Sequence, residues 1–162
     1  MKISRPMTAL ACALLSSSAL AALTLERTTS LSDSLGGSLN IATSGTLEIP
    51  GADTTSQATL TNFHPHDNQD LVANGSVTRM RTRSAEVVTS TYNGNLSLSG
   101  TDSKGKAIND SLVLQNLQVV REGEGPAFTG TIVLNGTNID AAQMPDDVKH
   151  LLHRVLRFFY FD

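Results

Sequence analysis

The chain has 162 residues, of which 12 are Lys or Arg and 15 are Asp or Glu, so its formal net charge is −3 at neutral pH. This acidic balance argues against a nucleic-acid-binding protein, because contact with phosphates needs a basic surface. Cys12 is the only cysteine and tryptophan is absent, which excludes a disulfide within the chain and leaves a core built mainly from aliphatic side chains.

The first 21 residues have the pattern of a secretory signal peptide. Lys2 and Arg5 precede an apolar run, and 16–21 has small residues at the two positions that a signal peptidase reads, with cleavage expected after Ala21. We therefore expect an exported protein, periplasmic or secreted, whose single mature domain covers 22–162 and has ten basic and fifteen acidic residues, a net charge of −5. The residues before Cys12 match a lipidation site poorly, which favours a cysteine in the discarded peptide over a lipid anchor.

The middle of the chain has the pattern of a series of β-strands. Apolar and polar residues alternate with a period of two, and clusters of Gly, Pro, Asn, Asp and Ser interrupt the alternation. Such segments are typical of half-buried strands, and a change of parity near Gln115 and Asn116 predicts a bulge. The predicted strands are 23–30, 38–49, 58–63, 71–83, 86–99, 111–120 and 127–136, and the predicted turns or loops are 32–37, 51–55, 64–70, 100–110 and 122–125.

A glycine-bounded motif occurs three times, at 44–51, 93–100 and 129–136. In each copy a small polar residue and Gly precede two aliphatic residues at a spacing of two, and a second Gly ends the motif. Because alternate residues of a strand share a face, we expect the aliphatic pairs to face a common interior, and the first glycine of each copy to mark a bend or bulge. The pairs are Leu47 and Ile49, Leu96 and Leu98, and Ile132 and Leu134; the first glycines are Gly45, Gly94 and Gly130.

The repeat extends beyond the motif itself. A degraded copy lies at 74–80, and a Leu-x-Asn sequence follows the first two copies, ending at Asn62 and Asn116. This spacing indicates duplicated hairpins. The sequence therefore predicts a mainly β fold: a curved antiparallel sheet, barrel-like or sandwich-like, built from repeated hairpins, with one C-terminal amphipathic α-helix.

The third copy is followed by a helical pattern, and no return strand is expected there. Pro145 with Asp146 and Asp147 marks a helix start, and apolar residues recur at helical spacing over about 146–158. Two interpretations of this helix stay open: it covers the open end or edge of the sheet, or its tail docks on a membrane surface or a partner protein. The tail concentrates aromatic residues, namely Phe158, Phe159, Tyr160 and Phe161.

Three arginines, Arg79, Arg81 and Arg83, occur at a spacing of two in a predicted strand. They must share one face of the strand and could bind a carboxylate, a sulfate or an anionic sugar. The alternative is a solvated stripe that protects an edge strand from aggregation.

Histidines offer a weak metal-binding pattern. His64 and His66 flank a proline, and His150 and His153 lie one helical turn apart, but no specific ligand spacing is present. We therefore predict no metal and no other cofactor. Motifs of nucleophilic catalysis and phosphate-binding loops are also absent from the sequence, so we predict that the protein is not an enzyme.

These observations favour an exported, non-enzymatic β-rich protein of the bacterial envelope or exterior. We expect it to bind another envelope protein or an apolar ligand through its sheet or through a groove between sheet and helix, and not to bind nucleic acid. The alternatives are a small outer-membrane β-barrel and, less favoured, a metalloenzyme that uses the histidines.

Overall fold

The computed structural model describes residues 23–48, 51–65, 70–101, 105, 107–123 and 125–161, and of Tyr160 and Phe161 only the backbone. The predicted signal peptide, Ile49 and His66 lie outside the described residues.

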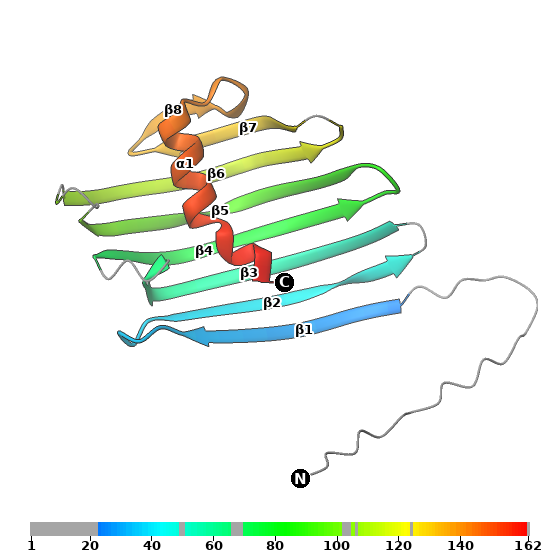
Figure 1. The fold of residues 1–162 in the computed structure, drawn as a ribbon, viewed down its shortest axis with the longest axis horizontal. Helices are drawn as coiled ribbons and strands as arrows, with labels where there is room; N and C mark the ends of the chain where they lie inside the picture. Colours follow the sequence, from blue (N-terminus) through cyan, green and yellow to red (C-terminus); the bar gives the residue numbers. More distant parts are fainter. Residues whose placement is uncertain are drawn as a thin grey trace, which may run out of the picture.

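Eight strands form one antiparallel sheet in which every strand pairs with its neighbour in the sequence (Figure 1). The expected mainly β fold built from hairpins is confirmed. β1 and β8 are the two edges, so the sheet is open: it neither closes on itself nor faces a second sheet among the described residues. The strands are β1 (Leu23–Ser32), β2 (Ser38–Glu48), β3 (Gly51–Phe63), β4 (Leu71–Arg83), β5 (Val88–Thr101), β6 (Ala107–Arg121), β7 (Pro126–Leu134) and β8 (Thr137–Asp140).

The strand boundaries correct the sequence interpretation in three places. The predicted loop at 51–55 is the beginning of β3, and the predicted loop at 100–110 is shorter because β5 and β6 extend into it. The return strand that was not expected after the third copy exists as β8, in which Ile139 pairs with Ile132. All three errors fall on polar, Thr- or Asn-containing segments, where the pairing of backbone groups with a neighbouring strand outweighs a weak intrinsic preference.

The two faces of the sheet differ in polarity, because side chains alternate between them. The outer face is hydrophilic, as in Gln57 and Thr59 of β3 and Asn95 and Ser97 of β5, all of which are exposed. The inner face carries the core. Its buried apolar side chains are Leu39, Ile41, Ala58, Leu60, Leu71, Ala73, Val77, Leu96, Leu98, Leu112, Leu114, Leu117 and Ile132.

A helical segment crosses the inner face from β8 toward β3 (Figure 1). It consists of η2 (Ala141–Gln143), α1 (Asp146–Val155) and η3 (Arg157–Phe161). Asp146 and Asp147 occupy the first turn of α1, where negative charge is favourable, and Val148, Leu152 and Val155 are buried against the sheet. The predicted amphipathic helix is confirmed, although it ends earlier than expected and continues as a 3-10 turn. No helix in the described part of the chain has the length and apolar character needed to cross a bilayer.

Two β-bulges of the same construction show that the sequence repeat corresponds to a repeated local structure. Asn62 in β3 and Asn116 in β6 adopt left-handed backbone conformations, with φ of 48° and 50°, where the strand registers shift. The backbone amide of Asn62 donates to Oδ1 of Asn74 at 2.7 Å, and that of Asn116 donates to Oδ1 of Asn93 at 2.8 Å. Asparagine tolerates this conformation better than most residues. The predicted bulge in β6 is therefore confirmed, and an equivalent one lies in β3.

Glycine is required where a neighbouring backbone approaches a bulge closely. Gly130 in β7 has a φ of 101°, and a Cβ atom at this position would overlap the carbonyl oxygen of Asn116. This confirms the expected role of the first glycine in the third copy.

The aliphatic pairs of the three copies do not contribute equally to the core. Leu96, Leu98 and Ile132 are buried and Leu134 is partly buried, as expected. The prediction is wrong for Leu47, which is 38% exposed. Leu47 shares the inner face with the others, but it lies at the far end of β2, beyond the reach of the helical segment.

Candidate ligand-binding groove

A groove of about 150 Å³ lies between α1 and the inner face of β5, β6 and β7. Its floor consists of side chains from three strands, and one wall is the flank of α1 that carries Lys149, Leu152 and His153. The lining residues are Tyr92, Leu117, Val119, Arg121, Pro126, Phe128, Met144, Lys149, Leu152, His153 and Leu156.

The strand register explains why the floor is apolar. Val119 of β6 pairs with Phe128 of β7, and Leu117 pairs with Tyr92 of β5, so these four side chains project from the same face. The helical segment crosses the sheet obliquely and leaves the end of β6 uncovered (Figure 1). Because α1 covers only part of this apolar surface, its open side stays accessible to a ligand.

Apart from Tyr92, the ionisable side chains among the described lining residues are basic: Arg121, Lys149 and His153. Lys149 also forms an ion pair with Asp146, with Nζ 3.0 Å from Oδ1. Both side chains are substantially exposed, so this pair contributes little to stability. Among the described residues, the lining contains no serine, cysteine or carboxylate.

The three arginines of β4 share the inner face, as their spacing predicts. Arg79 pairs with Tyr92 and Arg83 with Val88 in register, which places them in the same face as the core residues. β4 is a central strand, so the interpretation of the stripe as protection of an edge strand is wrong. Arg81 is partly exposed and Arg83 is exposed.

Arg79 differs from the other two because it is only 6% exposed. Its Nη1 donates to the backbone carbonyl oxygen of Phe159 at 2.7 Å, and its Nη2 donates to Oγ of Ser56 at 3.4 Å. The guanidinium carbon also lies 5.0 Å from the centre of the Phe159 ring, a cation–π contact. Arg79 therefore anchors the C-terminal segment to the sheet.

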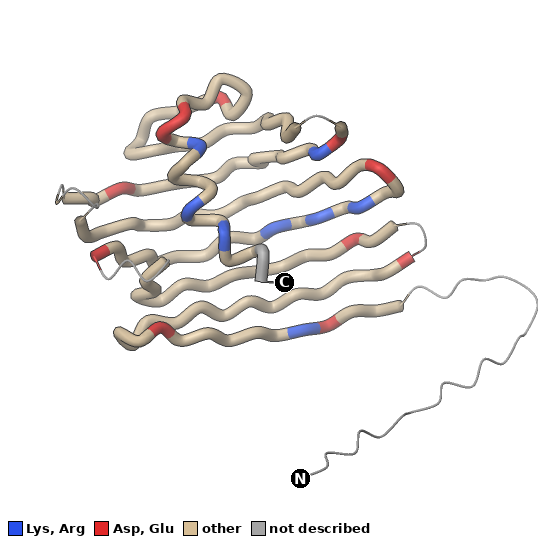
Figure 2. Tube along the Cα trace, viewed as in Figure 1, with Lys and Arg blue, Asp and Glu red and all other residues tan. Residues whose placement is uncertain are grey.

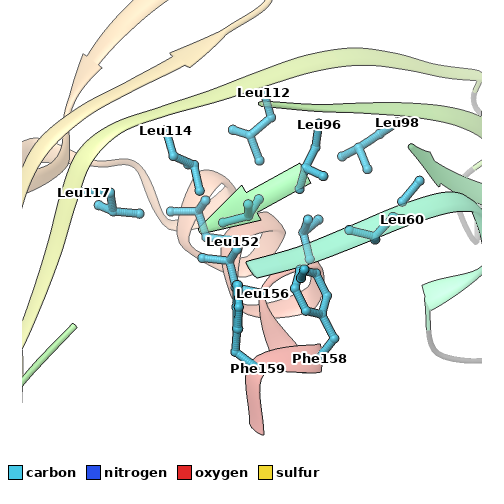
Figure 3. Close-up of a cluster of buried hydrophobic side chains, with 14 of the residues drawn as sticks. Leu60, Leu96, Leu98, Leu112, Leu114, Leu117, Leu152, Leu156, Phe158 and Phe159 are labelled. Atoms are coloured by element: carbon cyan, nitrogen blue, oxygen red, sulfur yellow. The ribbon is translucent and has the colours of Figure 1, made fainter. Parts of the chain in front are cut away.

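The described part of the aromatic tail belongs to the core. Phe158 and Phe159 are buried, and their ring centres lie 4.7 Å apart. Figure 3 shows both rings beside Leu152 and Leu156 and below the leucines of the sheet. The edge of Tyr92 also meets Phe159, with ring centres 5.6 Å apart. Both phenylalanines pack the helical segment against the sheet. The structure does not describe the side chains of Tyr160 and Phe161.

A second polar cluster joins the β1–β2 turn to the end of β3. One carboxylate oxygen of Asp33 accepts from the backbone amides of Leu35 and Gly37, and the other accepts from the backbone amide and Nδ1 of His64, each at 2.8 Å. Burial alone would raise the pKa of Asp33, but the hydrogen bond from the His64 ring and the three backbone hydrogen bonds outweigh it and hold this pKa well below its ordinary value. The contact with His64 spans 31 residues, so a local sequence pattern could indicate the turn at Asp33 but not its partner.

The structure separates the candidate histidines. His64 lies at the β1–β2 turn with Asp33, whereas His153 lines the groove beside α1. No group of three or more His, Cys, Asp or Glu side chains that could hold a metal ion occurs in the described ranges. The candidate His66 lies outside them.

Comparison of the chain with models of known protein families, with curated proteins and with solved structures finds no match.

Proposed function

We propose that this protein is an exported, non-enzymatic binding protein that holds a short apolar group of its ligand in the groove between α1 and β5–β7. The observation that supports this function best is an accessible apolar floor next to a core that is otherwise covered by the helical segment. Ligand sites are typically concave and mainly apolar, with a few polar groups at defined positions.

The volume of the groove limits the size of the apolar group that it can hold. An apolar cavity of about 150 Å³ in another protein accommodates a molecule of the size of benzene. The groove, at about 150 Å³, therefore suits a single ring or a short alkyl chain, and a longer ligand would extend from its open side. A neutral molecule of this size should bind weakly, because it makes few contacts.

The experiment is an NMR titration of the mature chain with 1-hexanol, with backbone amide shifts as the readout. We expect saturable shifts for the residues of β6, β7 and α1 that surround the groove. Val119→Trp should abolish these shifts, because the larger side chain fills the groove from its floor.

A matched control uses the same substitution on the same strand. Val113 of β6 pairs with Asn95 and Val133, residues of the outer face, so Val113→Trp should leave hexanol binding unchanged. Equal hexanol shifts in Val119→Trp and the unmodified protein would refute the groove as the binding site.

Export is tested separately. When the full chain is produced in a Gram-negative bacterium, we expect osmotic shock to release the protein from the periplasm with Ala22 as its N-terminal residue. Recovery of the protein from the outer membrane would instead support the alternative function of an integral membrane protein.

A further inference from the structure

We propose that the ligand of the groove is a small carboxylate, whose short alkyl or aryl tail occupies the apolar floor and whose head group binds Arg81 and Arg83. This inference deepens the proposed function and rests on it. It is based on the distribution of charge along the uncovered end of the inner face.

The strand register arranges this end of the sheet in two rows. Both rows lie on the inner face. In the row nearest the strand ends, Arg83 pairs with Val88, Val88 with Arg121, and Arg121 with Pro126. In the next row, Arg81 pairs with Ser90, Ser90 with Val119, and Val119 with Phe128. Both rows therefore run from an arginine of β4 to residues that line the groove.

The distance between the arginines of β4 and the groove floor on β6 suits one small ligand. Neighbouring strands lie about 4.8 Å apart, so the backbones of β4 and β6 are separated by about 10 Å. The surface between them is formed by Ser90 and Val88, both of which are partly exposed. A carboxylate above these residues lies within reach of the long side chains of Arg81 and Arg83, while its tail enters the groove over Val119.

The charge of the two rows favours an anion. Neither row contains a carboxylate. Asp53, an acidic residue of the neighbouring β3, pairs with Thr82 and Thr46 and so belongs to the outer face. Glu86 and Glu122 lie beyond the strand ends, and Figure 2 shows acidic positions in the turns at this end of the sheet. Arginine is the preferred partner of a carboxylate, since its planar guanidinium can donate two parallel hydrogen bonds.

The test compares three probes that share one tail: hexanoate, 1-hexanol and hexyltrimethylammonium. Binding is followed at neutral pH and low salt by the amide shifts of β6, β7 and α1. We expect hexanoate to bind at least about fivefold more tightly than hexanol, which corresponds to about 1 kcal/mol for one solvent-screened charge contact. The cationic probe should bind most weakly. The preference for hexanoate should diminish in about 1 M salt, where the Debye length is about 3 Å.

Two double variants test the assignment to specific residues. Arg81→Gln with Arg83→Gln should remove most of the preference for hexanoate over hexanol and leave hexanol binding unchanged. Arg27→Gln with Arg154→Gln changes the net charge equally at exposed positions outside the groove lining, and should preserve the preference for hexanoate.

The outcomes separate this inference from the proposed function. Saturable binding of all three probes with equal affinity would overturn the carboxylate ligand and leave the groove intact as an apolar site. Failure of all three probes to bind would overturn both proposals. A preference for hexanoate that persists in the Arg81 and Arg83 variant would overturn the assignment of the head group to these arginines.

Discussion

The packing of the C-terminal segment can be tested at Phe159, which is 2% exposed. Phe159→Ala removes a ring that contacts Phe158, Tyr92 and the guanidinium of Arg79. Replacing a buried phenylalanine by alanine typically costs 3–5 kcal/mol, because apolar burial is lost and a cavity remains. We expect the free energy of unfolding to fall by about 4 kcal/mol, a large part of the 5–15 kcal/mol that stabilises a typical domain.

This loss is measurable by urea denaturation and by thermal unfolding. For a domain of this size it should lower the melting temperature by about 10 °C. The matched control is Leu23→Ala on the edge strand, where the side chain is 64% exposed and the change should stay within about 0.5 kcal/mol. A double-mutant cycle of Phe159→Ala with Tyr92→Ala should yield a coupling energy of about 0.5–1.5 kcal/mol for the aromatic pair.

The result that would refute this reasoning is a Phe159→Ala variant whose stability lies within about 1 kcal/mol of the unmodified protein. The C-terminal segment would then not be packed against the sheet in solution. The groove, one wall of which is α1, would lose its structural basis.

Two further predictions concern the turn and the bulges. The folded-state pKa of Asp33 is depressed, so the stability conferred by its carboxylate is fully present above the ordinary pKa of 3.8 and is lost as the pH falls below this value. Asp33→Asn should therefore reduce the free energy of unfolding by about 1–3 kcal/mol at neutral pH. It should also flatten the pH dependence of the urea midpoint below pH 3.8. If the urea midpoints of the two proteins fall in parallel as the pH is lowered, this prediction is wrong. Gly130→Ala should cost at least about 3 kcal/mol, from backbone strain and overlap with Asn116. Gly136 has a φ of 79° and open space around it. Gly136→Ala should therefore cost only the backbone strain, about 1 kcal/mol. Equal decreases in melting temperature for Gly130→Ala and Gly136→Ala would show that the close approach to Asn116 is unimportant.

Local periodicity explains the predictions that are confirmed. The aliphatic residues at 96, 98 and 132 reach the core because a strand places alternate side chains on one face. The same rule brings the arginines of β4 to one face. The negative charges of Asp146 and Asp147 in the first turn and the helical spacing of the apolar residues that follow predict α1 for equally local reasons.

Long-range pairing explains what the sequence analysis missed. β8 is too short and polar to be recognised before its partner β7 is known. The contact of Asp33 with His64 and the anchoring of Phe159 by Arg79 each join residues that are far apart in the chain. Leu47 has the same alternation as Leu96, but only the position of the helical segment decides that Leu96 is covered and Leu47 is not.

The sequence by itself thus determined the kind of element at most positions and the face to which each side chain belongs, because both follow from the geometry of neighbouring residues. Only the tertiary structure decided that the sheet is open, how far the helical segment reaches across it, and that an apolar groove with an arginine-bearing end remains beside α1. The physical reason is that burial depends on which distant segment covers a face, and the amphipathic pattern of a strand is the same whether a helix, a ligand or water lies above it.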